Sequence, residues 1–417
     1  MKKQLKNTGF ILAGLFFSIT MLCAQTGEGF FTIGGVVKNA KNKKTVEYVN
    51  VSAVGTNVGT ITNENGEFML KINNDADVRE IELSSLGYYN AKYTISKSSE
   101  AKSVFYLTPR SIELKELEVV SWKNPEDLVR AAVDKIGDNY GAAPNLLTGF
   151  YRETIQKGRK YITVSEAVIE TYKSAYTKDA RGDKVQVLKG RKLLSPNVKD
   201  TLSVKLLGGP NIAIYVDAVK NMEILLEKEM LHWYAYKMGD VTSIDDRLQY
   251  VVHFEPQVVA STPLYIGTYY IDKETLAFTR IDFKIEMRDK QKVTGIILKN
   301  KPSGLRFTPD NVEYVVAYKQ QGGKNYLNYI RNEMDFRCDW KKKLFSTRYT
   351  VISEMVVTDR MSEPFSKITG KDAFSMRKSL SDEVMSYYDK NFWGAYNIIE
   401  PTESLESAVG KLKKAEF

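Results

Sequence analysis

The 417-residue sequence contains few of the residues from which catalytic and metal sites are usually built. It has only two cysteines and two histidines. His232 and His253 belong to neither a His-x-x-Glu nor a His-Glu-x-x-His motif, so no zinc-ligand pattern is present. A Gly-x-Ser-x-Gly motif and a glycine-rich phosphate loop ending in lysine are also missing. These absences exclude the metalloprotease, serine-hydrolase and nucleotide-binding signatures that a sequence can reveal.

Long hydrophobic runs are also scarce. The run from Phe10 to Leu22 is shorter than the ~20 residues that a membrane-spanning helix needs. Three lysines precede it and the small pair Cys23-Ala24 follows, which is the order of a secretory signal. We expect residues 1–24 to be cleaved and the mature chain to have no transmembrane helix. The alternative is a lipoprotein signal with Cys23 as the lipidated residue, although Leu22 occupies a position that favours a small residue.

The charge balance is only mildly basic. The formal charge is +9, and removing residues 1–24 takes away three lysines, which leaves 9 − 3 = +6. Because this excess is spread along the chain, it favours ordinary solubility over a nucleic-acid partner and is compatible with an anionic membrane surface. Cys338 is then the only cysteine, so an intramolecular disulfide cannot form. The core must therefore supply the stability.

The first part of the mature chain has the periodicity of strands with one buried face. Apolar residues alternate with polar ones in three short segments, and Asn65-Gly66 between two of them suits a two-residue hairpin turn. The segment 63–66 lacks the carboxylates of a calcium loop. The alternating residues are Val49, Val51, Ala53, Phe68, Leu70, Ile72, Ala91, Tyr93 and Ile95.

This part resembles the carboxypeptidase-regulatory-like domain, a transthyretin-like fold common in envelope and secreted proteins of the Bacteroidetes. The resemblance implies a β-sandwich over residues 30–108, and the family is itself non-enzymatic. The motifs that carry the match are Gly35-Val36-Val37, Val49-Asn50-Val51, Gly55-Thr56, Gly59-Thr60-Ile61-Thr62-Asn63, Asn65-Gly66-Glu67-Phe68 and Ser85-Leu86-Gly87-Tyr88.

Residues 109–144 are predicted to link this sandwich to a second domain. An extended segment is expected at 112–121, and a helix at about 125–140 begins with the N-cap residue Asn124, then Pro125 and two acids. The apolar face of this helix consists of Leu128, Ala132, Val133, Ile136 and Tyr140.

Residues 145–417 are predicted to form a larger, curved antiparallel sheet with packed helices. Asn211 to Lys228 has apolar residues at helical spacing and is expected to be a helix against the sheet. A second helix is expected after Thr402, with early acids, late lysines and a face of Leu405, Val409 and Leu412. The segments rich in Tyr, Val, Ile and Thr that indicate strands are 150–153, 161–172, 250–256, 264–272, 278–287 and 348–357.

Two resemblances bear on this region. The segments FYRE (150–153), FRCDWKKK (336–343) and FWGAYNIIEPTESLE (392–406) are similar to the companion region of uncharacterised Bacteroidetes proteins that begin with the same module. The segment 263–283 is similar to a strand–turn–strand unit of periplasmic lipoprotein carriers, and this implies a half-open barrel wrapped round a helix.

The candidate reactive groups do not assemble into a site by sequence. Cys338 lies in a strand-like context without a neighbouring histidine, and pairs such as Asp245-Asp246 or Glu227 and Glu229 are typical of solvated faces. We therefore predict no catalytic residues, no metal ligands and no cofactor, and the ligand-binding residues stay unknown. The aromatic residues that could form an exposed platform are Trp233, Tyr234, Tyr236, Tyr387, Tyr388, Phe392, Trp393 and Tyr396.

The combined prediction is a non-enzymatic binding or assembly protein of the cell envelope, exported to the periplasm or associated with the outer membrane. Its partner is either an unidentified envelope protein or a lipid-like ligand, and no nucleic acid is expected. The first alternative is a periplasmic carrier or sensor that holds a lipid-like ligand in an apolar cavity lined by Asn211 to Lys228. The second alternative is a hydrolase whose site the sequence does not reveal.

Overall fold

The computed structural model describes residues 29–96, 102–111, 122–195, 197, 202–206, 209–341, 345–376, 378–388 and 393–413. Strands predominate over helices, as the sequence predicts. Within these residues no helix has the length and apolar composition that crossing a membrane requires. The predicted signal segment 1–24 and the strand expected at 112–121 lie outside the described residues. The division at residues 30–108, 109–144 and 145–417 stays a prediction.

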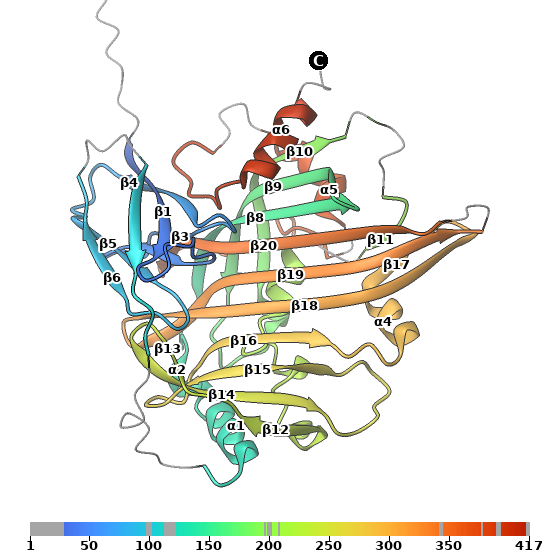
Figure 1. The fold of residues 1–417 in the computed structure, drawn as a ribbon, viewed down its shortest axis with the longest axis horizontal. Helices are drawn as coiled ribbons and strands as arrows, with labels where there is room; N and C mark the ends of the chain where they lie inside the picture. The colour runs from blue at the N-terminus through green and yellow to red at the C-terminus, as the bar shows by residue number, and fades with distance from the viewer. Residues whose placement is uncertain are drawn as a thin grey trace, which may run out of the picture.

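Two small sheets form the N-terminal sandwich, drawn in blue in Figure 1. One has the strand order β4-β1-β7, with β1 and β7 parallel, and the other has the order β3-β2-β5-β6. Val51, Leu70 and Leu83 are completely buried because alternate residues of each strand point between the sheets. The strands are β1 (Phe30–Asn39), β2 (Asn50–Ala53), β3 (Gly59–Ile61), β4 (Glu67–Asn73), β5 (Glu80–Ser84), β6 (Ala91–Thr94) and β7 (Ser103–Leu107).

Asn65 and Gly66 form a turn, but the predicted two-residue hairpin is wrong. Gly66 has a φ of 74°, in the left-handed region that glycine adopts easily, and its N–H donates to the carbonyl of Asn63. The flanking strands β3 and β4 belong to different sheets. The turn therefore carries the chain from one sheet to the other, and strand periodicity alone does not say which strands will pair.

Eleven antiparallel strands form the large, curved sheet (Figure 1), in the order β10-β9-β8-β20-β19-β18-β16-β15-β14-β12 with β13 paired to β14. The strands β18 and β19 have 17 residues each, which corresponds to a length of roughly 55 Å. The strands are β8 (Asn145–Lys157), β9 (Lys160–Lys173), β10 (Lys184–Leu194), β12 (Tyr234–Met238), β13 (Thr242–Ile244), β14 (Arg247–Pro256), β15 (Tyr265–Asp272), β16 (Phe278–Ile285), β18 (Leu305–Gln321), β19 (Lys324–Trp340) and β20 (Thr347–Ser362).

The inner face of the large sheet is covered by helices α1 (Pro125–Asp134) and α2 (Ile136–Asn139) and by residues 209–233. The side chain of Asn124 accepts a hydrogen bond from the N–H of Glu126, and Pro125 opens α1, as predicted. The expected helix is divided at Lys135. All of its predicted apolar residues are buried, namely Leu128, Ala132, Val133, Ile136 and Tyr140.

The single helix predicted from Asn211 to Lys228 is wrong. The chain forms the short helix α3 (Pro210–Tyr215), then turns and the 3-10 helix η3 (Met222–Ile224). Tyr215 is 40% exposed, although the periodicity places it on the buried face. The helix is interrupted where Asp217 binds the sheet, because its carboxylate accepts hydrogen bonds from Lys173 and Tyr318. The segment still lies against the sheet, as predicted, and Leu226 is completely buried.

The N-terminal sandwich and the C-terminal segment 393–402 cover part of the outer face of the large sheet. Ile61 of the sandwich, Phe150 of β8 and Ile399 belong to one hydrophobic cluster. Asn397 pairs with the backbone of Lys71 in β4, accepting from its N–H at 2.6 Å and donating to its carbonyl at 3.0 Å. A segment near the end of the chain therefore holds the sandwich against the sheet.

The C-terminal helix α6 (Glu403–Lys413) follows Thr402, whose hydroxyl accepts from the N–H of Leu405 at 3.2 Å. Leu405 and Val409 are buried against β9 and β10, which confirms the predicted docking. The side chain of Leu412 lies outside the description. The remaining elements are η2 (Ala180–Gly182), β11 (Lys205–Leu206), η4 (Leu231–Trp233), α4 (Lys290–Ile297), β17 (Leu298–Asn300), α5 (Leu380–Glu383) and η5 (Val384–Tyr387).

Candidate functional site

Five polar side chains form a line across the inner face of the large sheet. Adjacent members stand directly opposite one another on β19, β20, β8, β9 and β10. Directly opposite side chains in antiparallel sheets have Cβ atoms about 5 Å apart, so the line is a continuous set of hydrogen-bonding groups. We call it the polar row, and its members are Asn332, Ser353, Glu153, Ser165 and Lys192.

Mostly apolar lines of side chains flank the polar row on both sides, two residues away along each strand. A polar line between two apolar lines resembles the lining of ligand pockets, in which a few polar groups orient a ligand held by apolar surface. One flanking line consists of Met334, Val351, Ile155, Thr163 and Leu194, and the other of Ile330, Met355, Tyr151, Ala167 and Gly190.

A cavity of about 320 Å³, here called the inner cavity, lies over this part of the sheet. Four of the five polar-row residues line it, and α5 and β11 contribute to its opposite wall. Leu194 is 45% exposed and the side chain of Lys205 is 63% exposed, so the cavity reaches solvent between β10 and β11. The volume falls within the ~300–1,000 Å³ typical of ligand pockets. The apolar lining consists of Ile155, Leu194, Leu202, Val204, Leu206, Met334 and Val351.

Glu153 lies at the centre of the polar row and is 7% exposed. Burial raises the pKa of its carboxyl to about 7, although a hydrogen bond from the Tyr151 hydroxyl at 3.3 Å and the charge of Lys192 act in the opposite direction. The carboxyl is therefore roughly half protonated at neutral pH, and it can donate as well as accept a hydrogen bond.

Two other members of the polar row have buried atoms without a partner. Within the described part of the chain, the Oγ of Ser165 and the Oδ1 of Asn332 make no hydrogen bond. Ser165 is completely buried. A buried polar atom left unpaired costs about 1–3 kcal/mol. Asn332 lines the inner cavity and Ser165 does not, so a ligand that supplied the partner missing at Asn332 Oδ1 would remove part of this cost. Asn332 Oδ1 therefore marks the expected position of a ligand's polar part.

A second group of buried polar residues on the inner face consists of two lysines and two aspartates that form ion pairs. We call Lys173, Asp183, Asp217 and Lys220 the charge cluster. Lys173 Nζ lies 2.7 Å from Asp217 and 3.5 Å from Asp183. Burial lowers the pKa of Lys173, but the two carboxylates outweigh burial and raise it. Lys220 Nζ donates to the carbonyls of Ser174, Ala175 and Lys178, so the cluster fixes the chain to the sheet.

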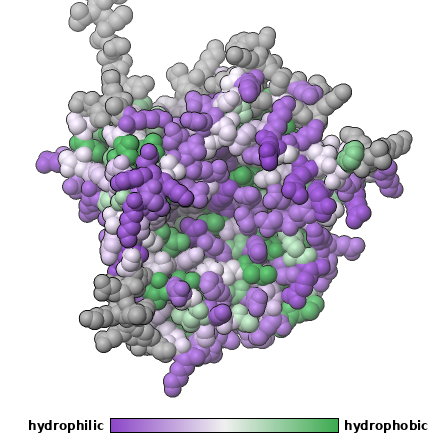
Figure 2. Space-filling model, viewed as in Figure 1, coloured by the Kyte–Doolittle hydropathy of each residue, from purple (hydrophilic) through white to green (hydrophobic). Residues whose placement is uncertain are grey.

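A larger depression of about 910 Å³, here called the outer groove, lies on the opposite face over β12, β14, β15, β16 and β18. Figure 2 views this face, on which polar and apolar side chains are mixed. Lys237 and His253 are exposed in the groove, and His253 Nδ1 lies 2.9 Å from the Thr268 hydroxyl. We take the inner cavity as the candidate site because its lining contains a buried carboxyl and an unpartnered polar atom.

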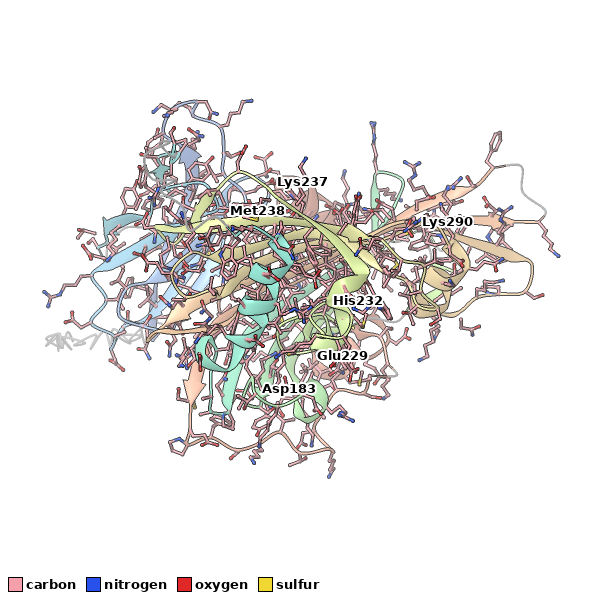
Figure 3. All side chains as sticks on the ribbon, turned by 90° about the horizontal axis from the view of Figure 1, so that it is seen from below. Asp183, Glu229, His232, Lys237, Met238 and Lys290 are labelled. Atoms are coloured by element: carbon pink, nitrogen blue, oxygen red, sulfur yellow. The ribbon has the colours of Figure 1, made fainter. Side chains whose placement is uncertain are left out.

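The structure places the histidines and the cysteine apart. His232 precedes β12 and is exposed, and Figure 3 shows it on the same side of β12 as Glu229. Among the described residues no group of three or more His, Cys, Asp or Glu side chains could hold a metal ion. Cys338 lies in β19, as predicted, and burial raises its pKa to about 11. A protonated, buried thiol is a poor nucleophile.

The paired acids are structural or surface groups. Asp245 and Asp246, with φ values of 50° and 58°, form the turn between β13 and β14. The Asp246 carboxylate accepts from the N–H of Asn90 at 2.8 Å, so this turn contacts the sandwich. The pKa of Glu227 is raised by partial burial and by a hydrogen bond with Glu229. Neither pair lines the inner cavity.

The aromatic residues considered as a binding platform belong mainly to packed regions. Tyr234 is 1% exposed and Trp233 packs against the main core. Trp393 packs edge-on against Phe150, whereas Tyr388 is 56% exposed. Phe392 lies outside the described residues. Tyr234, Trp233 and Trp393 are thus packed into the molecule, and the possible platform of exposed aromatic residues is not formed by these three.

The polar row was not recognised from sequence, although one signal was present. Glu153 alternates with Tyr151 and Ile155 in β8, so a carboxyl occupies the apolar face of a strand. Ser165 lies in the next strand, β9, whereas Lys192, Asn332 and Ser353 come from strands farther away in the sequence. Neither the inner cavity nor the outer groove is lined by residues 211–228, so a cavity lined by that segment stays a prediction.

The N-terminal sandwich matches a known family. Residues 33–120 match the family model described as the CarboxypepD_reg-like domain. The N-terminal module is a carboxypeptidase-regulatory-like domain. The resemblance inferred from its motifs is thus confirmed for this part of the chain, whereas a Bacteroidetes origin stays a prediction. Among curated proteins, no sequence matches this chain.

Two solved structures are similar to this chain at a low level. A domain from Vibrio parahaemolyticus, described as an outer membrane lipoprotein-sorting protein domain, has 12% identity and a TM-score of 0.28, with coverage of 57% of this chain and 93% of that domain. A DUF1329 family protein from Desulfovibrio piger has 11% identity and a TM-score of 0.23, with coverage of 55% and 89%. Similarity at this level carries no functional argument.

Proposed function

We propose that this chain is a non-enzymatic binding protein of the cell envelope that holds an amphipathic ligand in the inner cavity. The polar row is the observation that carries the proposal. Four of its five residues line the cavity between two mostly apolar lines, and one of these four, Asn332, has a buried Oδ1 without a partner among the described residues. This arrangement is costly for a purely structural core and suits a ligand with a polar head and an apolar chain.

The polar groups favour a head that donates hydrogen bonds. Asn332 Oδ1 needs a donor, and Glu153 can either donate or accept near neutral pH. A hydroxyl-bearing or amide head satisfies both groups, whereas a bare carboxylate cannot donate to Asn332. The apolar chain of the ligand would lie against Ile155, Met334 and Val351. We infer a neutral, hydroxyl-rich lipid-like ligand such as a monoacylglycerol.

The polar contacts inside the cavity favour binding over hydrolysis. The hydroxyls of Ser379 and Ser381 lie 3.2 Å from each other. Lys192 Nζ donates to the carbonyl of Ser381 at 2.5 Å. The lysine is thus engaged by a backbone oxygen instead of being hydrogen-bonded to a serine hydroxyl as its general base. This geometry supports a role without covalent catalysis.

The test is calorimetric titration of the mature protein with monododecanoylglycerol and with dodecanoate below their micelle concentrations. We expect saturable binding of monododecanoylglycerol and binding of dodecanoate at least about tenfold weaker, since each unpaired polar group costs about 1–3 kcal/mol. Val351→Phe should fill the cavity and abolish binding. Val104→Phe, at a 48% exposed position of the sandwich, is the matched control and should bind normally.

A second pair of variants separates the head from the chain. Ser353→Val and Asn332→Leu make the polar row more apolar without removing the cavity, so they should reduce the preference for monododecanoylglycerol over dodecanoate. Circular dichroism melting checks that each variant folds. Failure of the unaltered protein to bind either probe, or equal binding by the Val351→Phe variant, would contradict the proposal.

The envelope location has its own test. If residues 1–24 are a cleaved signal, the protein isolated from its native cells should begin at Gln25 and occur in the envelope fraction. Mass spectrometry of the amino-terminal peptide distinguishes this result from a chain that begins at Cys23 with a lipid attached. A cytoplasmic chain that retains residues 1–24 would overturn the proposed location.

A further inference from the structure

Two apolar side chains protrude at the end of the molecule that is remote from the N-terminal sandwich. Val259, in the loop between β14 and β15, is 88% exposed, and Phe345, beside the hairpin between β19 and β20, is 83% exposed. In the described part of the chain, the other exposed large apolar side chains reach at most 56%. Both loops lie at the right of the view in Figure 1. Side chains this exposed need an explanation.

The same end is rich in cations. Residues 286–306 contain six lysines and arginines and two carboxylates, whereas the whole chain is nearly balanced with 60 basic and 51 acidic residues. Figure 3 shows Lys290 at this end. Arg288, Lys290 and Lys292 pair with carboxylates. Within the described ranges Lys301 donates to the carbonyl of Leu305 and, like the exposed Arg306, forms no ion pair.

Backbone and side-chain contacts join these features into one surface. Lys292 Nζ, in α4, donates to the carbonyl of Ala260, one residue from Val259. The N–H of Lys341, at the end of β19, donates to the carbonyl of Gly304. The loop at 257–263, the stretch 286–306 and residues 340–341 are therefore joined. Phe345 lies at the same end because Thr347, two residues later, pairs with Cys338 near the end of β19. We call all of these residues the basic end.

We propose that the basic end docks on an anionic lipid bilayer. Val259 and Phe345 would enter the headgroup region, while Lys299, Lys301 and Arg306 would lie near the lipid phosphates. Each cation near an anionic surface contributes about 1 kcal/mol, and reversible binding of this kind generally combines charge with apolar insertion. Val259 and Phe345 stand on separate loops next to cations, an arrangement that suits insertion into the headgroup region of an anionic bilayer.

The position of this surface has a consequence for the inner cavity. Lys299 belongs to the basic end and also lines the cavity. Docking would therefore bring the solvent-exposed side of the cavity near the membrane, where an amphipathic ligand could enter or leave. This consequence rests on the proposed function, whereas the docking itself rests only on exposure and charge.

The experiment is co-flotation of the mature protein with phosphatidylcholine vesicles that contain or lack phosphatidylglycerol. We expect binding only to the anionic vesicles, and weaker binding in high salt because charges are screened. Lys301→Ala with Arg306→Ala should lower the partition coefficient by roughly 20-fold or more, about fivefold per cation. Val259→Ser with Phe345→Ser should lower the partition coefficient in low and high salt alike.

Matched controls lie on the sandwich at the opposite end. Lys41→Ala with Lys44→Ala removes two exposed cations, and Val104→Ser removes an exposed apolar side chain. These variants should partition normally, and monododecanoylglycerol binding should survive in the basic-end variants. The docking proposal would be overturned if the basic-end charge variant and the sandwich charge variant partitioned equally. It would also be overturned if the unaltered protein bound neutral and anionic vesicles equally, or bound neither. None of these outcomes concerns the inner cavity, so the two proposals can fail separately.

Discussion

The charge cluster and the polar row are both buried on the inner face of the large sheet, but they differ in how many of their polar atoms have a partner. Lys173 and Asp217 lie 2.7 Å apart, and the Asp217 carboxylate also accepts from Tyr318 at 2.6 Å. In the polar row, Ser165 Oγ and Asn332 Oδ1 have no partner within the described residues, and Asn332 lines the inner cavity. Every residue of the charge cluster is ion-paired, and Asp183 Oδ2, which makes no hydrogen bond among the described residues, still lies 3.5 Å from Lys173 Nζ. Buried polarity compensated in this way serves the fold, whereas an unpaired polar atom in the lining of a cavity indicates binding.

The charge cluster should give the largest stability effect. Asp217→Ala leaves Lys173 and Lys220 with Asp183 as their only carboxylate in the cluster. Removing one partner from a buried ion pair costs about 3–5 kcal/mol, which urea unfolding would detect as a lower midpoint. Replacing the pair with Lys173→Met and Asp217→Leu should recover most of the loss. A loss below about 1 kcal/mol for Asp217→Ala would show that the cluster is not essential to the fold.

Glu153→Gln should raise the free energy of unfolding, in contrast to Asp217→Ala, and the size of this effect should depend on pH. The folded carboxyl has a pKa near 7 and a usual value of 4.5, so the unfolded chain loses its proton first. Stability therefore falls as pH rises from about 4.5 through about 7, by about 3 kcal/mol in all, and this contribution becomes constant only above about pH 8. The glutamine variant should be more stable at pH 8 and lose this part of the slope. Urea unfolding at pH 5 and pH 8 measures both effects, and an unchanged slope would contradict the assigned pKa.

Ser174 and Ser165 provide the most closely matched comparison, and their variants should give the smallest changes in stability. Ser174 Oγ donates to Asp183 at 2.8 Å and accepts from Lys220 at 2.9 Å, whereas Ser165 Oγ has no partner. Ser174→Ala should cost about 1–2 kcal/mol, but Ser165→Ala should be neutral or stabilising by up to about 1 kcal/mol. Thermal unfolding measures both. Equal losses would remove the distinction between the two groups.

Much of the strand and helix content was accessible from local pattern, but the pairing was not. The periodicity around Val51 and Leu70 predicted buried strands, and Asn124-Pro125 correctly predicted the start of α1. The hairpin at Asn65-Gly66 failed because β3 and β4 pair with other strands. The helix from Asn211 failed because Asp217 is bound by the sheet instead of continuing the helical pattern.

For the candidate site, the sequence predicted less. It contained the carboxyl of Glu153 between Tyr151 and Ile155, which a strand places on one face. The sequence did not reveal that Asn332 and Lys192 lie on the same face as that carboxyl. A shift of one residue in any strand pairing would move their side chains to the other face of the sheet. The site is thus a product of register across five strands.

The sequence by itself determined the carboxypeptidase-regulatory-like module, the predominance of strands and the starts of α1 and α6, because these depend on turn residues, caps and alternation between near neighbours. The tertiary structure decided which strands pair, which buried charges meet and where a cavity remains. Those outcomes depend on contacts between residues far apart in the chain, and their energies are set by burial and hydrogen bonding that no short segment specifies.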